Sequence, residues 1–368
     1  MEDWQERALN ILEQLGGAPA TSFHEGPVEK VIESTLTNFG IPSHKDQFGN
    51  IIAKLDASST DHTDPETIPA IAFVAHMDHP GFEIVSIEDQ TLGAVALGGV
   101  PPGGYETGLS LEIILPDDTR IPSNISTANP EERTINIHLP EKQNIPIPCP
   151  AIFNLIDFSI DEDFIRMRAL DDLAGCGSIL ASLEILKDEK IPTDVYGVFT
   201  RAEEVGLIGA RLMAEAMILP MDTFVVSLES SRTLPGAEMG EGPVIRVGDA
   251  GLTFDTEAET ILHKAKECLQ TSSNPIKIQR QLMSGGTCEA SAFTLYGYRT
   301  TGIAFPLGNY HNGTPSSGIG PEFIHMQDYW GGIQLITEAV RQVPNRENTA
   351  FRQRISSIPS ELSQRLKQ

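Results

Sequence analysis

Two adjacent glutamates, Glu203 and Glu204, follow a short apolar stretch in the segment VFTRAEEVGLIGAR (residues 198–211). Adjacent like charges repel and acidic side chains are poor strand formers, so this pair should lie where a strand ends. A solvated turn is one interpretation of the pair. The other interpretation is that the two carboxylates have separate chemical tasks, and the rest of the chain must decide between the two.

Three further apolar runs end close to a histidine or an acid. They are AIAFVAH with His76 and Asp78, TFVVSLE with Glu229, and TTGIAFP with His311 shortly beyond it. A metal-bound imidazole commonly donates its second N–H to a carboxylate, and Asp78 lies two residues after His76, where it can face the same way. Taken singly, these residues also have plain interpretations as a hydrogen-bonded loop pair, a surface glutamate and a loop histidine.

Two aspartates, Asp171 and Asp172, open a helix-like segment in RALDDLAGCG. An acidic residue at this position caps a helix and interacts favourably with the helix dipole. Capping explains one of the two carboxylates and leaves the other without a task.

These residues share a place at the end of a strand or the start of a helix. In an open α/β sheet, ligands bind beyond the carboxyl ends of the strands, so the side chains should converge on one rim. The converging set is His76, Asp171, Glu203, Glu204, Glu229 and His311. Two imidazoles and several carboxylates suit Zn²⁺, Co²⁺ or Mn²⁺. Because the carboxylates would repel one another without cations, we expect two divalent metals that share a bridging carboxylate.

The elements that must position this rim alternate between strand-like and helix-like segments. This alternation predicts an α/β fold with a mainly parallel or mixed sheet between helices. Four apolar runs suit strands buried on both faces, and helical patterns follow several of them. These runs are residues 70–76, 194–200, 223–229 and 300–306. Near the N-terminus, Ser22 and Glu25 have capping-box spacing in SFHEGPVEKVIESTL, which predicts the start of an amphipathic helix.

The pattern changes between residues 87 and 150, where Pro and Gly are frequent and no helical periodicity occurs. LSLEIILPDDTRIP predicts a hairpin, and RTINIHLP predicts another strand. We therefore expect a small all-β, barrel-like domain at 87–150, inserted between two parts of one catalytic domain, 1–86 and 151–345. Its apolar strands need a covering partner, which predicts a homo-oligomer. The polar tail, residues 346–368, is expected to form a surface helix.

Composition and charge exclude several classes of protein. A net charge of −25 without a Lys/Arg cluster disfavours nucleic acid and membrane partners. No run reaches the roughly 18 apolar residues of a membrane span, and the N-terminus lacks a signal-peptide pattern. Four cysteines without a CxxC pair fit a reducing cytoplasm. No GxGxxG follows a strand and no Walker A sequence occurs, which disfavours a nucleotide-binding doubly wound protein.

The motifs AHMDxxGF, ALDDxxG, FTxxEEVGLxGA, GGTxxxA and YH, in this order, resemble those of the metallo-aminopeptidases of the glutamyl aminopeptidase and tetrahedral aminopeptidase group. The resemblance covers nearly the whole chain and includes DQFGNIIAKL, GEGPVI and SGGTCEASAF. It implies a zinc-peptidase type of fold. It also implies that the inserted β domain takes part in assembly, from dimers up to dodecamers.

The same resemblance implies a role for each residue of the rim. Asp171 would be the carboxylate that bridges both metals, Glu203 the general base, and Asp78 the residue that orients His76. The remaining metal ligands that it implies are His76, Glu204, Glu229 and His311.

Four departures from the usual motifs leave this metal set whole and concern the substrate pocket. Glu229 stands where relatives more often have Asp, Leu173 replaces a basic residue, the last histidine lies in GNYHNG, and DHPGF replaces DEIGF. Arg201 and Arg232 flank the ligands in sequence. They would either favour acidic substrate side chains or balance the cluster of carboxylates.

We therefore predict a cytoplasmic co-catalytic metallo-aminopeptidase that removes N-terminal residues from short peptides, with two divalent metal ions per subunit. A metal-bridged hydroxide would attack the scissile carbonyl, with Glu203 as the general base. The alternatives are a related di-metal amidohydrolase, such as a carboxypeptidase or deacylase, and a non-catalytic scaffold of the same fold. A nucleophile at Cys288 is disfavoured, because Gly285 and Gly286 more simply allow close backbone packing. Surface positions are expected for His44, His62 and His263.

Overall fold

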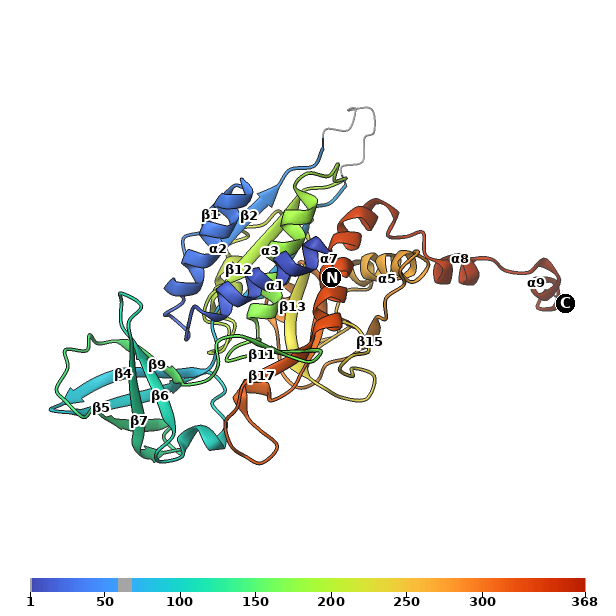
Figure 1. Ribbon diagram of the computed structural model, residues 1–368. Coiled ribbons are helices and arrows are strands. Elements are labelled where there is room, and N and C mark those ends of the chain that lie inside the picture. Colours follow the sequence, from blue (N-terminus) through green and yellow to red (C-terminus); the bar gives the residue numbers. More distant parts are fainter. Residues whose placement is uncertain (1, 59–67, 368) are drawn as a thin grey trace.

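The computed structural model describes residues 2–58 and 68–367. These residues form an α/β domain, in which helices cover both faces of a sheet, and a β-barrel beside it (Figure 1). The predicted α/β fold, with a mixed sheet between helices and an inserted barrel-like domain, is confirmed. Within the described residues, no helix is both long enough and apolar enough to cross a membrane.

An eight-stranded sheet forms the centre of the α/β domain. In spatial order its strands are β1 (Ser43–Lys45), β2 (Ile51–Leu55), β12 (Val195–Thr200), β3 (Ile71–His76), β13 (Phe224–Arg232), β16 (Arg299–Leu307), β14 (Val244–Arg246) and β15 (Gln279–Gln281). The neighbours β12, β3, β13 and β16 run parallel and correspond to the four predicted apolar runs. β2 and β14 pair antiparallel with this parallel group, so the sheet is mixed.

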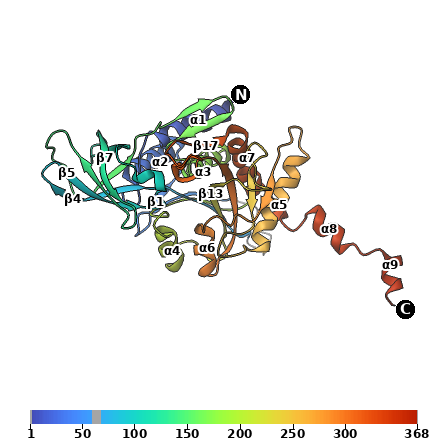
Figure 2. The same cartoon turned by 90° about the horizontal axis from the view of Figure 1, so that it is seen from below.

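The central strands are buried on both faces, which explains their continuous apolar sequence. In β3, Ile71, Phe73 and Ala75 face a larger core, and Ala72 and Val74 face a smaller one on the other side. The larger core packs against α1 (Asp3–Gly16), α2 (Gly26–Phe39), α3 (Leu173–Leu186), α5 (Thr256–Gln270) and α7 (Met326–Gln342). The smaller core lies under α4 (Ile208–Glu215) and α6 (Glu289–Leu295), on the opposite face of the sheet (Figure 2).

The inserted domain is a closed six-stranded barrel with its own apolar core. Around the barrel the strands are β4 (Gly81–Glu88), β5 (Thr91–Leu97), β8 (Thr134–His138), β7 (Arg120–Asn129), β6 (Ser110–Ile114) and β9 (Cys149–Phe153). The barrel extends beyond the predicted range 87–150 at both ends. β4 begins only five residues after the end of β3, and its Phe82 and Ile84 belong to the barrel core.

Shorter elements complete the fold. A three-stranded sheet contains β10 (Ser159–Asp161), β11 (Phe164–Met167) and β17 (Glu322–His325), and the 3-10 turns are η1 (Pro102–Tyr105), η2 (Tyr310–Asn312) and η3 (Val343–Asn345). The tail contains two short helices, α8 (Ala350–Ser356) and α9 (Ser360–Arg365), and not the single helix predicted. Pro359 separates them, because proline lacks the backbone N–H and disfavours helical conformation in the preceding residue.

The helix predicted from SFHEGPVEKVIESTL is α2, but the predicted capping box is wrong. Glu25 is itself the N-cap residue and makes no side-chain cap hydrogen bond. Ser22 and Glu25 are both fully buried. They are bonded elsewhere, Ser22 to Asp78 and Glu25 to Arg201, at the carboxyl edge of the sheet.

Candidate active site

The structure brings the predicted rim residues together at the carboxyl edge of the parallel strands. His76 ends β3, Glu203 and Glu204 follow β12, Glu229 lies in β13, Asp171 precedes α3, and His311 lies in η2 after β16. Ligands of open α/β sheets bind at this edge. Segments far apart in the sequence therefore contribute to one cluster.

Asp171 lies between the two histidines of the cluster. Its carboxylate oxygens are 3.4 Å from Nε2 of His76 and 3.6 Å from Nε2 of His311. Asp171 belongs to two triads of candidate ligands, and within each triad the donor atoms lie within 4.8 Å of one another. One triad is His76, Asp171 and Glu229, and the other is Asp171, Glu204 and His311. A third set, which overlaps both, contains His76, Glu203 and Glu204.

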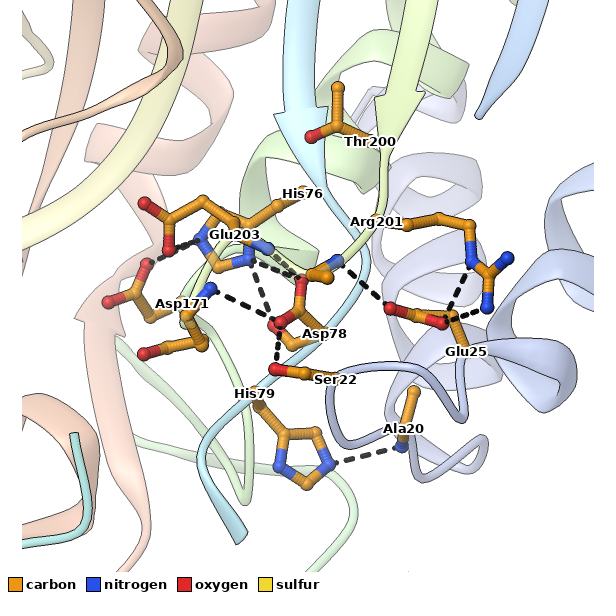
Figure 3. Close-up of polar contacts among 12 residues, drawn as sticks. Ala20, Ser22, Glu25, His76, Asp78, His79, Asp171, Thr200, Arg201 and Glu203 are labelled. Atoms are coloured by element: carbon orange, nitrogen blue, oxygen red, sulfur yellow. Dashed lines mark hydrogen bonds and ion pairs between the residues drawn. The ribbon is translucent and has the colours of Figure 1, made fainter. Parts of the chain in front are cut away.

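Asp78 organises the loops around His76, but without the carboxylate–imidazole hydrogen bond that we expected. Nδ1 of His76 donates to the backbone carbonyl of Asp78 at 2.9 Å, whereas Oδ1 of the Asp78 carboxylate is 3.8 Å away. Because a carbonyl only accepts, Nδ1 carries the proton and Nε2 keeps its lone pair for a metal. The Asp78 carboxylate instead accepts the backbone N–H of Glu203 at 2.9 Å (Figure 3). It also accepts the backbone N–H of Glu204 at 3.2 Å.

Further buried contacts hold the loop of the adjacent glutamates from the other side (Figure 3). Ser22 donates to the Asp78 carboxylate at 2.5 Å. Glu25 accepts the backbone N–H of Ala202 at 2.9 Å and pairs with Arg201 at 2.7 Å. Arg201 therefore balances a buried acid beside the cluster and does not line its cavity.

The barrel contributes directly to the second histidine. Nδ1 of His311 donates to the carbonyl of Gly99 at 3.1 Å, which leaves Nε2 facing Asp171 and Glu204. The His311 ring also stacks on Tyr310, with 3.8 Å between the ring centroids. Gly99 follows β5, and a methyl group there would overlap the His311 ring. The barrel thus fixes both the tautomer and the position of one candidate ligand.

Two buried glutamates beside the cluster were not singled out from the sequence. Glu322, in β17, accepts two backbone N–H groups, including that of Asp171 at 3.0 Å. Glu289, at the start of α6, accepts from the hydroxyls of Thr200 (3.0 Å) and Ser227 (3.1 Å) on the strands that flank β3. Neither glutamate ends an apolar run, so the pattern that identified the other acids does not include them.

The two adjacent aspartates have different environments. Asp172 caps α3, since its Oδ1 accepts the backbone N–H of Gly175 at 3.1 Å. Asp171 does not cap the helix and faces the histidines. The peptide bond between the two aspartates is cis.

The electrostatics of the cluster favour a bound cation. Burial alone would raise the pKa of Asp171, but the two imidazoles beside it lower the pKa to about 2. Burial raises the pKa of Glu204 to about 7, and it raises the pKa values of Glu203 and Glu229 well above their ordinary range. Divalent cations would restore the ionised form of these carboxylates, so metal binding should release protons.

The donor atoms fit divalent metal ions. Oδ1 of Asp171 and Oε1 of Glu204 are buried and have no hydrogen-bond partner in the part of the chain that the structure describes. A buried charged oxygen without a partner is costly unless it meets a cation. Imidazole nitrogens and carboxylate oxygens are the ligands of Zn²⁺, Co²⁺ and Mn²⁺ sites. A cavity of about 230 Å³ adjoins both triads.

Three other residues near the cluster have distinct environments. Cys288 is fully buried, and burial raises its thiol pKa to about 12, which does not suit a nucleophile. Arg232 lies over the Tyr310 ring, with its guanidinium carbon 4.6 Å from the ring centroid. Arg246, not singled out from the sequence, is 2% exposed.

His44 and His263, two of the histidines predicted at the surface, are not part of the cluster. His44 is exposed, as predicted. His263 is half-buried and pairs with Glu259 at 2.9 Å. His62 lies outside the described residues.

The following similarities identify the chain as a peptide hydrolase of the aminopeptidase class. Residues 151–329 match the model of the M42 glutamyl aminopeptidase family. The chain is also 26% identical over 363 residues to the glutamyl aminopeptidase of Lactococcus lactis subsp. cremoris, a match that covers 89% of this chain and 96% of that one.

Two solved structures share the fold. An aminopeptidase from the archaeon Desulfurococcus kamchatkensis has a TM-score of 0.77 and 22% identity, and the match covers 95% of this chain and 99% of that one. The TET1 peptidase of Pyrococcus horikoshii has a TM-score of 0.75 and 22% identity, and the match covers 90% and 99% of the two chains. The resemblance to the glutamyl and tetrahedral aminopeptidases is therefore confirmed.

Replacing Gly99 with Ala should weaken binding of one metal ion, because the added methyl group displaces the His311 ring. The loss in affinity should be roughly 10–100-fold, as for other residues that orient a metal ligand. Metal content after dialysis at graded metal concentrations measures it, with Gly26→Ala as a control at a glycine that has open space around it. Unchanged metal affinity in a folded Gly99→Ala protein would contradict a positioning role for the barrel.

Proposed function

We propose that this protein is a co-catalytic metallo-aminopeptidase that removes N-terminal residues from short peptides. The observation that carries the proposal is the pair of donor triads that share Asp171 at the carboxyl edge of the sheet. The similarity to the Lactococcus lactis glutamyl aminopeptidase supports the same reaction. An amidohydrolase that acts on blocked or C-terminal groups would use the same metals, so the substrate distinguishes the two activities.

The two triads divide the candidate ligands between two cations. His76, Glu229 and Asp171 would hold one, and His311, Glu204 and Asp171 the other, with Asp171 as the bridge. When bound, two divalent cations (Zn, Co or Mn) supply Lewis acidity that acidifies a water molecule and polarises a scissile carbonyl. The two histidines present Nε2 toward this centre because their Nδ1–H groups donate hydrogen bonds to backbone carbonyls.

Glu203 is the carboxylate that neither triad needs, and we assign it the role of general base. Its Oε2 lies 3.8 Å from Nε2 of His76, and it lines the same cavity as Asp171 and Glu204. Burial raises the pKa of Glu203 well above its ordinary value, which favours a group that accepts a proton from water. Glu203 would then deliver the proton to the leaving amine.

A buried arginine beside the cluster supports a preference for acidic N-terminal residues. Nε and Nη1 of Arg246 have no hydrogen-bond partner among the described residues. Arg246 and Arg232 line a small cavity that shares Glu229 and Gly286 with the cavity of the triads. A substrate whose amine and carbonyl lie at the triads would place a side-chain carboxylate against Arg246, where two charge-assisted hydrogen bonds can form.

The barrel is our candidate for the assembly domain, with residues 1–86 and 151–345 as the two parts of the catalytic domain. The structurally similar TET1 peptidase of Pyrococcus horikoshii assembles into a tetrahedron or an octahedral shell, which supports a homo-oligomer for this chain. The net charge of −25 supports peptide partners over nucleic acids and membranes. The four free cysteines support a cytoplasmic location.

Hydrolysis of a substrate panel, with metal content measured on the same sample, tests the proposed reaction. We expect turnover of aminoacyl substrates with a free N-terminus, fastest for Glu and Asp, loss of turnover on chelation, and recovery on return of Zn²⁺, Co²⁺ or Mn²⁺. Replacement of Arg246 by Met should remove the preference for Glu and Asp and spare Ala and Leu substrates. Hydrolysis of N-acylated substrates only would favour a deacylase, and full activity in a verified metal-free sample would exclude the di-metal site.

The adjacent glutamates should respond differently to the same substitution. Glu203→Gln keeps the shape and removes the base, so turnover should fall on the order of 10²–10⁴-fold with both metals retained. Glu204→Gln replaces an anionic ligand with a neutral amide, so one metal should bind more weakly and turnover should partly recover at high metal concentration. Metal stoichiometry of the two variants, side by side, checks the assignment. The opposite result reverses the two roles, and no effect in either variant means that the pair is only a solvated turn.

A further inference from the structure

The C-terminal arm, defined as residues 350–367, carries a row of exposed apolar side chains. They are Phe351 (62% exposed), Ile355 (61%), Ile358 (73%), Leu362 (53%) and Leu366 (91%). Their spacing of three or four residues along the sequence is helical, although Ile358 lies between α8 and α9 and Leu366 follows α9. Single exposed apolar residues are ordinary on the surface of a protein, but several of them on one short segment mark an interaction surface.

The arm meets the body of its own chain near its start, where Phe351 and Arg352 line a cavity beside α5. The N–H of Ala350 donates to the Glu267 carboxylate at 2.9 and 3.1 Å. Beyond it, among the described residues, no hydrogen bond or ion pair joins residues 354–367 to the body. Figures 1 and 2 both show α8 and α9 extending away from the α/β domain.

The two helices of the arm need a partner to be stable. They have seven and six residues, and neither contains a buried residue. Isolated helices of this length are marginal in water, because most helical stability comes from packing of an apolar face. The cap at the start of α8 is nevertheless in place, since the Thr349 hydroxyl accepts the N–H of Arg352 at 3.2 Å. The sequence therefore encodes helices whose apolar face is left uncovered.

The charge of the arm is opposite to that of the body. The arm has four Lys or Arg side chains and one Glu, a net charge of +3, whereas the rest of the chain has 22 Lys or Arg and 50 Asp or Glu, a net charge of −28. Arg352, Arg354 and Arg365 lie between the apolar residues along the arm, and Lys367 follows the last of them. An acidic surface would attract this segment and let its apolar row be buried.

We propose that the arm docks on the acidic body of a second copy of this chain. Two arms would place like charges together, and α8 and α9 extend away from the body of their own chain. A second copy supplies both the opposite charge and a surface that the arm can reach. This contact between copies is additional to any contact made by the barrel, and it does not depend on the catalytic assignment.

Truncation after Thr349, compared with the full-length enzyme, tests the proposal. Sedimentation velocity across a range of concentrations should show that association between copies is weakened by at least about tenfold, since burial of even one large apolar side chain contributes that much. Aminopeptidase activity per subunit should be unchanged at a concentration where both proteins are assembled. Equal association constants for the truncated and intact chains would overturn the proposal.

Matched substitutions separate the apolar row from the rest of the arm. The triple variant Ile355→Ser, Ile358→Ser, Leu362→Ser should weaken association as much as truncation does. A control with Ser356→Ala, Ser357→Ala and Ser363→Ala should not. The variant Arg352→Glu, Arg354→Glu, Arg365→Glu should also weaken association, and by less as salt is raised, because salt screens exposed charges. Equal association for the Ile355/Ile358/Leu362 variant and the serine control would contradict the proposed contact.

Cross-linking identifies the surface on which the arm docks. A photo-reactive residue at position 358, in a mixture of isotopically labelled and unlabelled chains, should join labelled to unlabelled bodies. Cross-links confined to one chain would show that the arm folds back on its own body. Cross-links from arm to arm, or binding of the arm to anionic phosphatidylserine vesicles without any effect on association, would likewise exclude the proposed docking.

Discussion

Mutual repulsion among buried carboxylates is the constraint on which the rest of this structure depends. Four acids, Asp171, Glu203, Glu204 and Glu229, lie together at the edge of the sheet with two imidazoles among them. Burial raises the pKa values of three of them, and only Asp171, held between the histidines, has a pKa lowered to about 2. An uncompensated cluster of this kind would destabilise the fold, so the arrangement is understandable as a site for cations.

The surrounding elements hold the donors where a cation can use them. The Nδ1–H groups of both histidines donate hydrogen bonds to backbone carbonyls. His76 donates to Asp78 in the loop after β3, and His311 donates to Gly99, which follows β5 of the barrel. Asp78 and Glu322 accept the backbone N–H groups of the acidic loops, so the carboxylates proposed as metal ligands are free of these structural hydrogen bonds. The barrel thus contributes to the candidate active site as well as forming a neighbouring domain. A change in the position of the barrel would therefore displace His311.

The sequence was sufficient to predict the residues that end strands. His76 ends β3, Glu204 and His311 follow β12 and β16, and Glu229 ends an apolar run although β13 continues to Arg232. The fold rule for such sheets places these residues on one edge. It was not sufficient for contacts made by backbone groups, because any residue type supplies a carbonyl. Asp78 was therefore expected to orient His76 through its carboxylate, whereas its backbone carbonyl does so.

Residues outside the strand pattern were missed for a related reason. Glu289, Glu322 and Arg246 are buried by tertiary packing alone, and nothing in their neighbours along the chain marks them. The tail shows the same limit, since its polar composition predicts a surface helix, and Pro359 divides that helix into two.

Metal stoichiometry of Asp171→Asn, compared with Glu229→Gln and Glu204→Gln, tests the central claim most directly. If Asp171 is shared by both triads, its amide variant should lose affinity at both sites, so that equilibrium dialysis at a metal concentration that saturates the wild type finds well under one metal per subunit. Each glutamate variant should lose affinity at one site only and retain about one metal per subunit. Two tightly bound metals in a folded Asp171→Asn protein would contradict the shared ligand, and with it the explanation of why these carboxylates are gathered at one edge of the sheet.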